Sequence, residues 1–345
     1  MKPRTCHKTI EELSGYPLTS HALILCALAA LSFLIAGCAP KEPQVQFDAG
    51  LYKQILDRQK AGLAVEEDAL TKLPEMSVAE YESLGDRYAQ QGNWALSLLQ
   101  YDNALKADPT QTRVRYKLGL LLFKQGLANE AYNRFHEILD YDLKFALAYE
   151  GMGQAHLQMG NDEAAEQELR QALTLDPKLW KSHNLLGILY DRQKWHHKAV
   201  AEYKAGLALQ PGEPALHNNL GMAYYLSGQY EEAIRAFQQA LLSGTGESKI
   251  YNNLGLAYAK LKRYREALEA FKKATDEARA YNNLGLIYLG SGKPRHANAC
   301  FEKAVATHPR YYVKANENLA LAQQALANDS SAQGADGEKS AATCP

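Results

Sequence analysis

Six glycines recur along the chain at a constant interval of 34 residues, and a seventh follows after 30. These glycines are Gly85, Gly119, Gly153, Gly187, Gly221, Gly255 and Gly285. A short phrase recurs with them, because YNNLGLAY occupies residues 251–258 and YNNLGLIY occupies residues 281–288. A chain rarely repeats a catalytic centre, whereas stacked units need their packing residues once per unit. The period therefore predicts a repeat array.

Other positions of the repeat also share one chemistry when each unit is numbered so that this glycine is position 8. Position 7 is Leu in six units, position 11 is Tyr in five, position 20 is Ala in six and position 24 is aromatic in six. Positions 4, 8 and 11 fall on one face of a helix. Pro closes four units at position 32, where it ends the preceding helix because it lacks an amide and clashes with the turn before it. The pattern predicts two closely packed helices per unit, A and B, with the aromatic residue filling the space between units.

This pattern resembles the tetratricopeptide repeat, a helix–turn–helix unit of 34 residues. The resemblance implies an all-α fold, a right-handed superhelix (an α-solenoid) of about seven repeats. The units run over residues 78–111, 112–145, 146–179, 180–213, 214–247, 248–277 and 278–311. Ser77 and Glu80 have the spacing of a capping box at the first helix. We expect an amphipathic helix over 312–326 to cap the last unit, because the end of an array otherwise exposes an apolar face.

Three further segments complete this organisation. Residues 47–77 carry spaced leucines and predict a helical leader or a degenerate repeat, and residues 327–345 are rich in small polar residues and predict a disordered tail. Unit 248–277 lacks four residues, about one helical turn, just before Ala278. We therefore expect a shorter helix B, a tighter turn and a changed superhelix angle near 274–281.

The N-terminal segment 1–37 has the form of a processing signal rather than of a fold. A positively charged start precedes an apolar run of 15 residues at 22–36, which then ends in LIAGCAP. An aliphatic residue and two small residues before Cys38 resemble the lipobox of bacterial lipoproteins. The alternative is an ordinary signal sequence that happens to contain a cysteine.

The lipobox resemblance implies a covalent diacylglycerol and an N-acyl chain on Cys38, followed by a linker over 38–46. Three acyl chains anchor a protein firmly, since about two already suffice. Ala39 follows the cysteine, and the absence of Asp there implies the periplasmic face of the outer membrane in a Gram-negative bacterium. If the organism sorts lipoproteins by another rule, the inner membrane is the alternative.

The composition argues against several functional classes. Lys+Arg 38 against Asp+Glu 39 gives a net charge of −1, which excludes the basic excess of a nucleic-acid binder. The sequence has no metalloprotease, phosphate-loop or nucleophile-elbow motif, so we expect no enzyme, no metal and no cofactor beyond the lipid. Two cysteines, Cys300 and Cys344, remain after the N-terminal ones. A periplasmic location permits their pairing, but the loose tail favours free thiols.

The family resemblance places a partner-binding groove on helix A, at positions 2, 5, 9, 12 and 13 with position 6 at its edge. Asn occupies position 5 or 6 in the later units, and position 9 is apolar there. The candidate groove residues are Asn184, Asn218, Asn252 and Asn282 at position 5, Asn219, Asn253 and Asn283 at position 6, and Ile188, Met222, Leu256 and Leu286 at position 9. Amides hydrogen-bond a peptide backbone of any sequence. The alternative is that the asparagines join neighbouring repeats.

The first three units carry charged residues at the same positions, among them Glu82, Asp86, Arg113 and Lys117. They form either a second binding surface or a solvated face. We favour a scaffold that docks another envelope protein, similar to the tetratricopeptide lipoproteins that assist pilus and secretin assembly. The alternatives are an adaptor that recruits periplasmic hydrolases or proteases, and a non-catalytic subunit of an envelope enzyme. The sequence leaves open whether the array forms a homodimer.

Overall fold

A computed structural model describes residues 76–242, 247–307, 313–332 and 343–345. The chain divides into two compact units, Met1–Val65 and Glu66–Pro345. The first lies outside the described residues. The predicted signal peptide, the linker that begins at Cys38 and nearly all of the leader at 47–77 lie outside them as well.

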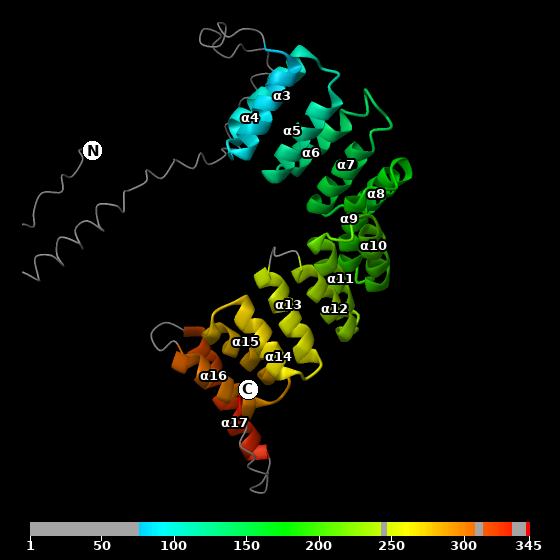
Figure 1. The fold of residues 1–345 in the computed structure, drawn as a ribbon. Helices are drawn as coiled ribbons and strands as arrows, with labels where there is room; N and C mark the ends of the chain where they lie inside the picture. The colour runs from blue at the N-terminus through cyan, green and yellow to red at the C-terminus, as the bar shows by residue number, and fades with distance from the viewer. Residues whose placement is uncertain (1–75, 243–246, 308–312, 333–342) are drawn as a thin grey trace, which may run out of the picture. The chain divides into compact units, whose positions relative to one another are not determined.

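Fifteen α-helices and no strand make up the described part of the chain. Labelled as in Figure 1, they are α3 (Val78–Gln90), α4 (Trp94–Ala107), α5 (Thr112–Lys124), α6 (Ala128–His136), α7 (Ala146–Met159), α8 (Asp162–Leu175), α9 (Trp180–Arg192), α10 (His196–Leu209), α11 (Pro214–Leu226), α12 (Tyr230–Leu241), α13 (Glu247–Lys260), α14 (Tyr264–Ala274), α15 (Glu277–Gly290), α16 (Pro294–Thr307) and α17 (Val313–Ala332). The all-helical repeat fold predicted from the sequence is confirmed.

The helices pack in the order in which they occur along the chain. Each odd-numbered helix from α3 to α15 is the helix A of a unit and packs on its helix B, which in turn packs on the helix A of the next unit. Helices A also touch one another directly, α5 with α7, α7 with α9, α9 with α11 and α11 with α13. Helices A from α5 to α13 therefore form a continuous layer (Figure 1).

In six of the seven units the recurring glycine lies under the aromatic ring of its own unit, and in unit three Gly153 lies against Leu169. A Cβ on Gly255 would lie 2.5 Å from a ring atom of Phe271, and one on Gly187 would lie 2.4 Å from the ring of Tyr203. Real Cβ atoms do not approach other heavy atoms so closely, so a glycine is required at position 8. The ring thus packs against helix A of its own unit, and the ring of Phe135 also lies against Gly151 of the next unit, as expected for a residue that fills the space between units.

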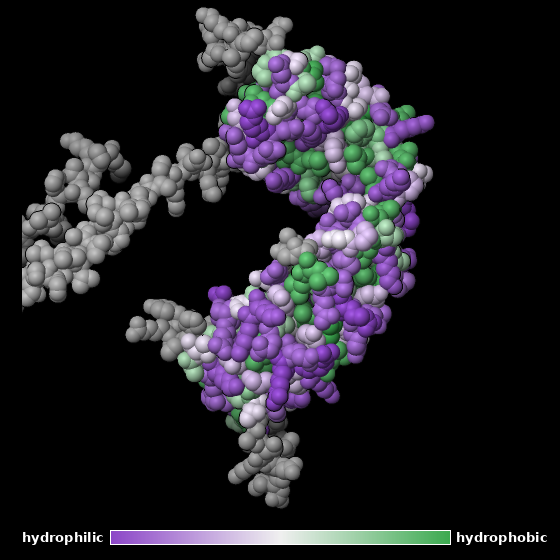
Figure 2. All heavy atoms as spheres, in the orientation of Figure 1, coloured by the Kyte–Doolittle hydropathy of each residue, from purple (hydrophilic) through white to green (hydrophobic). Residues whose placement is uncertain are grey.

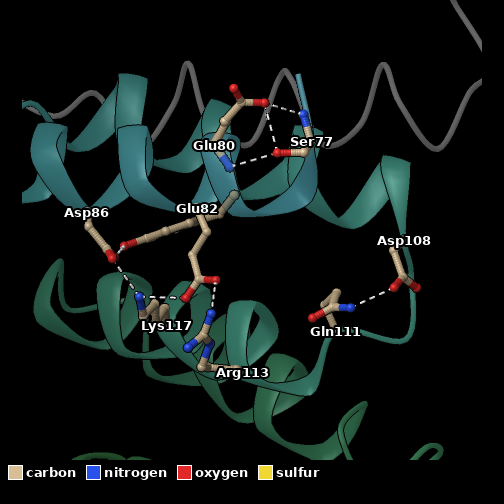
Figure 3. A network of polar contacts seen from close by, with 9 residues as sticks. Ser77, Glu80, Glu82, Asp86, Asp108, Gln111, Arg113 and Lys117 are labelled. Carbon is tan, nitrogen blue, oxygen red and sulfur yellow. Dashed lines mark hydrogen bonds and ion pairs between the residues drawn. The ribbon is translucent and has the colours of Figure 1, made fainter. Parts of the chain in front are cut away.

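The first helix begins with the predicted capping box, which is confirmed. The backbone amide of Ser77 donates to Oε2 of Glu80 at 2.7 Å, and Oγ of Ser77 accepts from the Glu80 amide at 3.3 Å (Figure 3). Two amides that have no partner inside the helix are satisfied in this way.

The shortened unit has the predicted shorter helix and tighter turn. Helix α14 has 11 residues, whereas α4, α8, α10 and α16 have 14 each. Helix α6 of unit two is shorter still, with 9 residues. Only residues 275–276 separate α14 from α15, and Oδ1 of Asp276 caps α15 by accepting from the amide of Arg279 at 2.9 Å. Direct contact between α13 and α15 is weaker than between the helices A from α5 to α13. The altered superhelix angle at this junction stays a prediction.

The C-terminal end differs from the prediction in two ways. Helix α17 runs to Ala332 rather than to residue 326, and it packs on α15 and α16. Cys344 is buried and forms a disulfide with Cys300 of α16, with their Cα atoms 5.0 Å apart. Nζ of Lys303 also donates to the backbone oxygen of Cys344 at 2.7 Å.

The preference for free thiols is therefore wrong, and so is a tail that is disordered throughout 327–345. The composition of this segment indicates only that it is polar and loose. Composition cannot show that Cys344 pairs with a cysteine of the last repeat 44 residues earlier in the sequence. Cys344 packs into the same apolar cluster as Phe301 of α16 and Ala322 of α17.

Candidate partner-binding surface

The asparagines of helix A form hydrogen bonds from one unit to the next. Nδ2 of Asn219 donates to Oδ1 of Asn184 at 2.9 Å, and Nδ2 of Asn253 donates to Oδ1 of Asn218 at 3.0 Å. At the end of the array, Nδ2 of Asn318 in α17 donates to Oδ1 of Asn282 at 2.9 Å. A buried amide needs such a partner, since an unpaired one costs about 1–3 kcal/mol. The amides thus join neighbouring helices A.

The prediction that Asn218, Asn253 and Asn282 line an open groove is therefore wrong, since these residues are only 6%, 8% and 5% exposed. Helices A approach one another directly, so position 5 faces the next helix A instead of the open side. Asn252 and Asn283 are half-buried, and within the described part of the chain no amide–amide hydrogen bond joins them. Asn252 belongs to the shortened unit six and Asn283 to the unit that follows it.

The apolar residues at position 9 of helix A are the more accessible part of this surface. Ile188 is 40% exposed and Leu286 is 44% exposed, while Met222 and Leu256 are half-buried. Two residues that the sequence analysis did not select, Leu120 and Leu226, are also exposed. We call the set the apolar strip: Leu120, Ile188, Met222, Leu226, Leu256 and Leu286. Figure 2 shows that hydrophilic residues interrupt the hydrophobic patches of the visible face.

The first two units carry a charged network on their helices A instead (Figure 3). Glu82 is buried, and Nζ of Lys117 lies 2.6 Å from its Oε1 and 2.6 Å from Oδ2 of Asp86. Arg113 pairs with the other carboxylate oxygen of Glu82 at 2.5 Å. The hydroxyl of Tyr101 donates to Asp86 at 2.7 Å, and burial together with this carboxylate raises the pKa of Tyr101. These charges neutralise one another, so they join two units.

A single buried carboxylate takes the same place between units three and four. Glu150 is buried at position 5 of α7, and its Oε2 accepts from the hydroxyl of Ser182 in α9 at 2.8 Å. Burial is the main cause that raises the pKa of Glu150 above its usual value. Position 5 is therefore a polar contact between units in both halves of the array, with chemistry that differs from unit to unit.

A recess of about 490 Å³ opens where units five, six and seven meet. Its walls include Tyr225 of α11, Leu256 and Lys260 of α13, and Ile287 of α15. The recess coincides with the junction at which α13 and α15 make their weaker contact. The recess thus lies beside the shortened unit six.

Tetratricopeptide-repeat family models match residues 85–126, 116–179, 151–214, 212–276 and 278–309, which together make up more than half of the chain. This chain is a tetratricopeptide-repeat protein. It is 36% identical over 98 residues to tetratricopeptide repeat protein 6 of Homo sapiens, a match that covers 28% of this chain and 19% of the human protein.

Solved structures share the fold of this tetratricopeptide-repeat protein. The Cut9 and Hcn1 hetero-tetramer of the APC/C is 20% identical with a TM-score of 0.51, over 72% of this chain and 53% of that one. The structure titled functional characterization of Pseudomonas aeruginosa pilF is 18% identical with a TM-score of 0.48, over 62% of this chain and 96% of that one. At these identities the likeness concerns the fold alone.

The described residues of this tetratricopeptide-repeat protein lack two kinds of feature. They contain no group of three or more His, Cys, Asp or Glu side chains that is arranged to hold a metal ion. None of the helices described is both long enough and apolar enough to cross a membrane. Tetratricopeptide folds generally serve as scaffolds that bind protein partners, and the chemistry of this surface, apolar side chains beside amides, belongs to that class.

Proposed function

We propose that this protein is a scaffold at the periplasmic face of the outer membrane and that it binds a segment of another envelope protein along the apolar strip. The observation that carries the proposal is the exposure of large apolar side chains at one repeated position of helix A, notably Ile188 and Leu286. Apolar side chains that stay exposed in a row are typical of a surface that a partner covers. The apolar contacts would supply affinity, and the half-buried Asn252 and Asn283 would hydrogen-bond the backbone of the partner.

Two features support an envelope location. The lipobox-like sequence before Cys38 supports an anchor of diacylglycerol and an N-acyl chain. The disulfide between Cys300 and Cys344 suits an oxidising compartment, such as the periplasm, because cytosolic thiols are kept reduced. Within the envelope we place the partner in pilus or secretin assembly, with an adaptor for periplasmic hydrolases as the second candidate.

Site-specific photocrosslinking in cells tests the binding surface. A photoreactive residue in place of Ile188 or Leu286 is expected to capture a protein, whereas the same residue in place of the exposed Gln239 on α12 serves as the matched control. Capture of a secretin or pilus component supports the assembly role, and capture of a hydrolase supports the adaptor. If Ile188 and Leu286 capture no more than Gln239 does, the apolar strip is not a docking surface.

Replacement of the lipidated cysteine tests the anchor separately. Cys38→Ala is expected to move the protein from the outer-membrane fraction to the soluble periplasmic fraction, because no acyl chain can then be attached. A Cys38→Ala protein that still sediments with the outer membrane would show that lipidation does not hold it there.

A further inference from the structure

The turn between helices A and B has a left-handed backbone at position 15 in all seven units. Glycine occupies this position in five units: Gly92, Gly126, Gly160, Gly228 and Gly292. Lysine takes its place in the other two, as Lys194 with φ 63° and Lys262 with φ 61°. Glycine adopts this conformation freely, whereas a residue with a Cβ is strained in it. The two lysines share this strain, so the surroundings of each side chain decide whether it has a role.

Lys262 lines the recess where units five, six and seven meet, whereas Lys194 does not line it. Lys260 and Lys293 line the recess as well, so three lysines belong to its walls. Among the described residues that form its walls there is no aspartate or glutamate. The recess therefore has a net positive charge without an internal counter-ion, and it attracts anionic groups.

Lys293 is held in place by its neighbour Tyr264. Its Nζ donates to the hydroxyl of Tyr264 at 3.3 Å and lies 5.0 Å from the centre of the same ring. Neither contact neutralises the charge, because a phenol hydroxyl and a ring face are uncharged partners. The ammonium group remains able to accept a carboxylate as a further partner.

The recess is continuous with the apolar strip, because Leu256 belongs to both. Tyr225 and Ile287 add apolar surface to its walls. A partner segment that lies along helices A would therefore place one side chain near the lysines and a neighbouring side chain on Leu256. This arrangement matches a segment in which an acidic residue stands beside an apolar one.

We propose that the recess binds an aspartate or glutamate side chain of the partner protein segment, with Lys262 as the main cation. The inference rests on the proposed function, since it specifies the chemistry of the segment that the apolar strip binds. A carboxylate between ammonium groups forms charge-assisted hydrogen bonds, which are stronger than neutral ones. The strained Lys262 would thereby select acidic partners.

Selection of short random peptides on the full-length protein tests this proposal. We expect the selected peptides to carry Asp or Glu next to an apolar residue. Lys262→Gly should weaken their binding roughly five- to tenfold, the loss of one charge-assisted contact. Lys194→Gly is the matched control, because it relieves the same backbone strain outside the recess, and it should leave the affinity unchanged. Both variants should unfold at the same temperature as the parent or at a higher one.

Three outcomes would overturn the proposal. If the selected peptides lack acidic residues and Lys262→Gly binds them equally well, the recess does not bind acidic side chains. The proposed function would still stand if those peptides compete with crosslinking at Ile188. Failure to select any peptide would count against the proposed function as well. Binding to phosphatidylglycerol vesicles that Lys262→Gly abolishes would assign the recess to lipid headgroups instead of a protein.

Discussion

The two ends of the array use different chemistry for the same task. Between units one and two, position 5 is Glu82, and it holds the next unit through the charges of Arg113 and Lys117. Between units five and six, position 5 is Asn218, and it holds the next unit through one neutral amide of Asn253. The packing underneath is the same, since an aromatic ring covers a glycine in both places.

This difference shows which positions of the repeat are fixed by geometry and which are not. Position 8 must be glycine because a Cβ would collide with the side chain at position 24, which is an aromatic ring in six units and Leu169 in unit three. Position 5 needs only a polar partner on the next helix A, so a carboxylate or an amide serves equally well. Ionic and neutral junctions nevertheless respond differently to charge, pH and salt, and these responses separate the two regions experimentally.

Removal of the aromatic ring that covers the glycine should destabilise the protein most, and to a similar extent in both regions. Phe135→Ala in unit two and Phe271→Ala in unit six are each expected to lower the free energy of unfolding by about 3–5 kcal/mol, through lost burial and a cavity. Thermal and urea unfolding would measure this loss. A large difference between the two variants would mean that the packing layer is not equivalent along the array.

Truncation of the polar contact should give a smaller and unequal effect. Glu82→Ala removes the contacts with two charged side chains and is expected to lower the free energy of unfolding by about 2–3 kcal/mol. Asn253→Ala removes one neutral hydrogen bond and is expected to lower it by about 1–2 kcal/mol. Amide hydrogen exchange read separately over α3–α6 and α11–α14 would localise each loss, because repeats interact mainly with their neighbours. Equal losses would contradict the contrast between an ionic and a neutral junction.

The carboxylate of Glu150 should make the junction of units three and four sensitive to pH. Burial raises its pKa in the folded state above the unfolded value, so the folded protein binds the proton more tightly between the two pKa values. Stability should therefore fall as the pH rises through that range. Glu150→Gln keeps an acceptor for Ser182 and is expected to remove this dependence. Unfolding curves of both proteins from acidic to neutral pH would detect it, and unchanged pH dependence in the variant would exclude Glu150 as its source.

Salt should produce the smallest difference. Arg113 is largely exposed, so its attraction to Glu82 is screened as ionic strength rises, and we expect a loss of under about 1 kcal/mol at the first junction. The amide pair of Asn218 and Asn253 carries no charge and should not respond. Hydrogen exchange at low and high sodium chloride would show protection that falls over α3–α6 alone, and a parallel fall over α11–α14 would contradict this.

The fold was predictable because each packing residue recurs. Gly255 and Phe271 stand at fixed positions of a period, and their contact follows from two helices per unit. The asparagines were harder to interpret, since an amide suits a peptide backbone and a neighbouring helix equally well. Only the direct approach of helices A shows that Asn218 and Asn253 meet. Cys344 lies outside the repeat, so no periodicity indicated that it returns to Cys300.

The four residues missing from unit six also have an evolutionary meaning. In a globular core, a deletion of this size would displace residues throughout the protein, but stacked units confine it to the junction of units six and seven. The recess lies at that junction, while the rings that cover Gly255 and Gly285 keep their contacts. A deletion within one unit of a repeat protein can in this way open a recess in one step, and substitutions to lysine in its walls can come later.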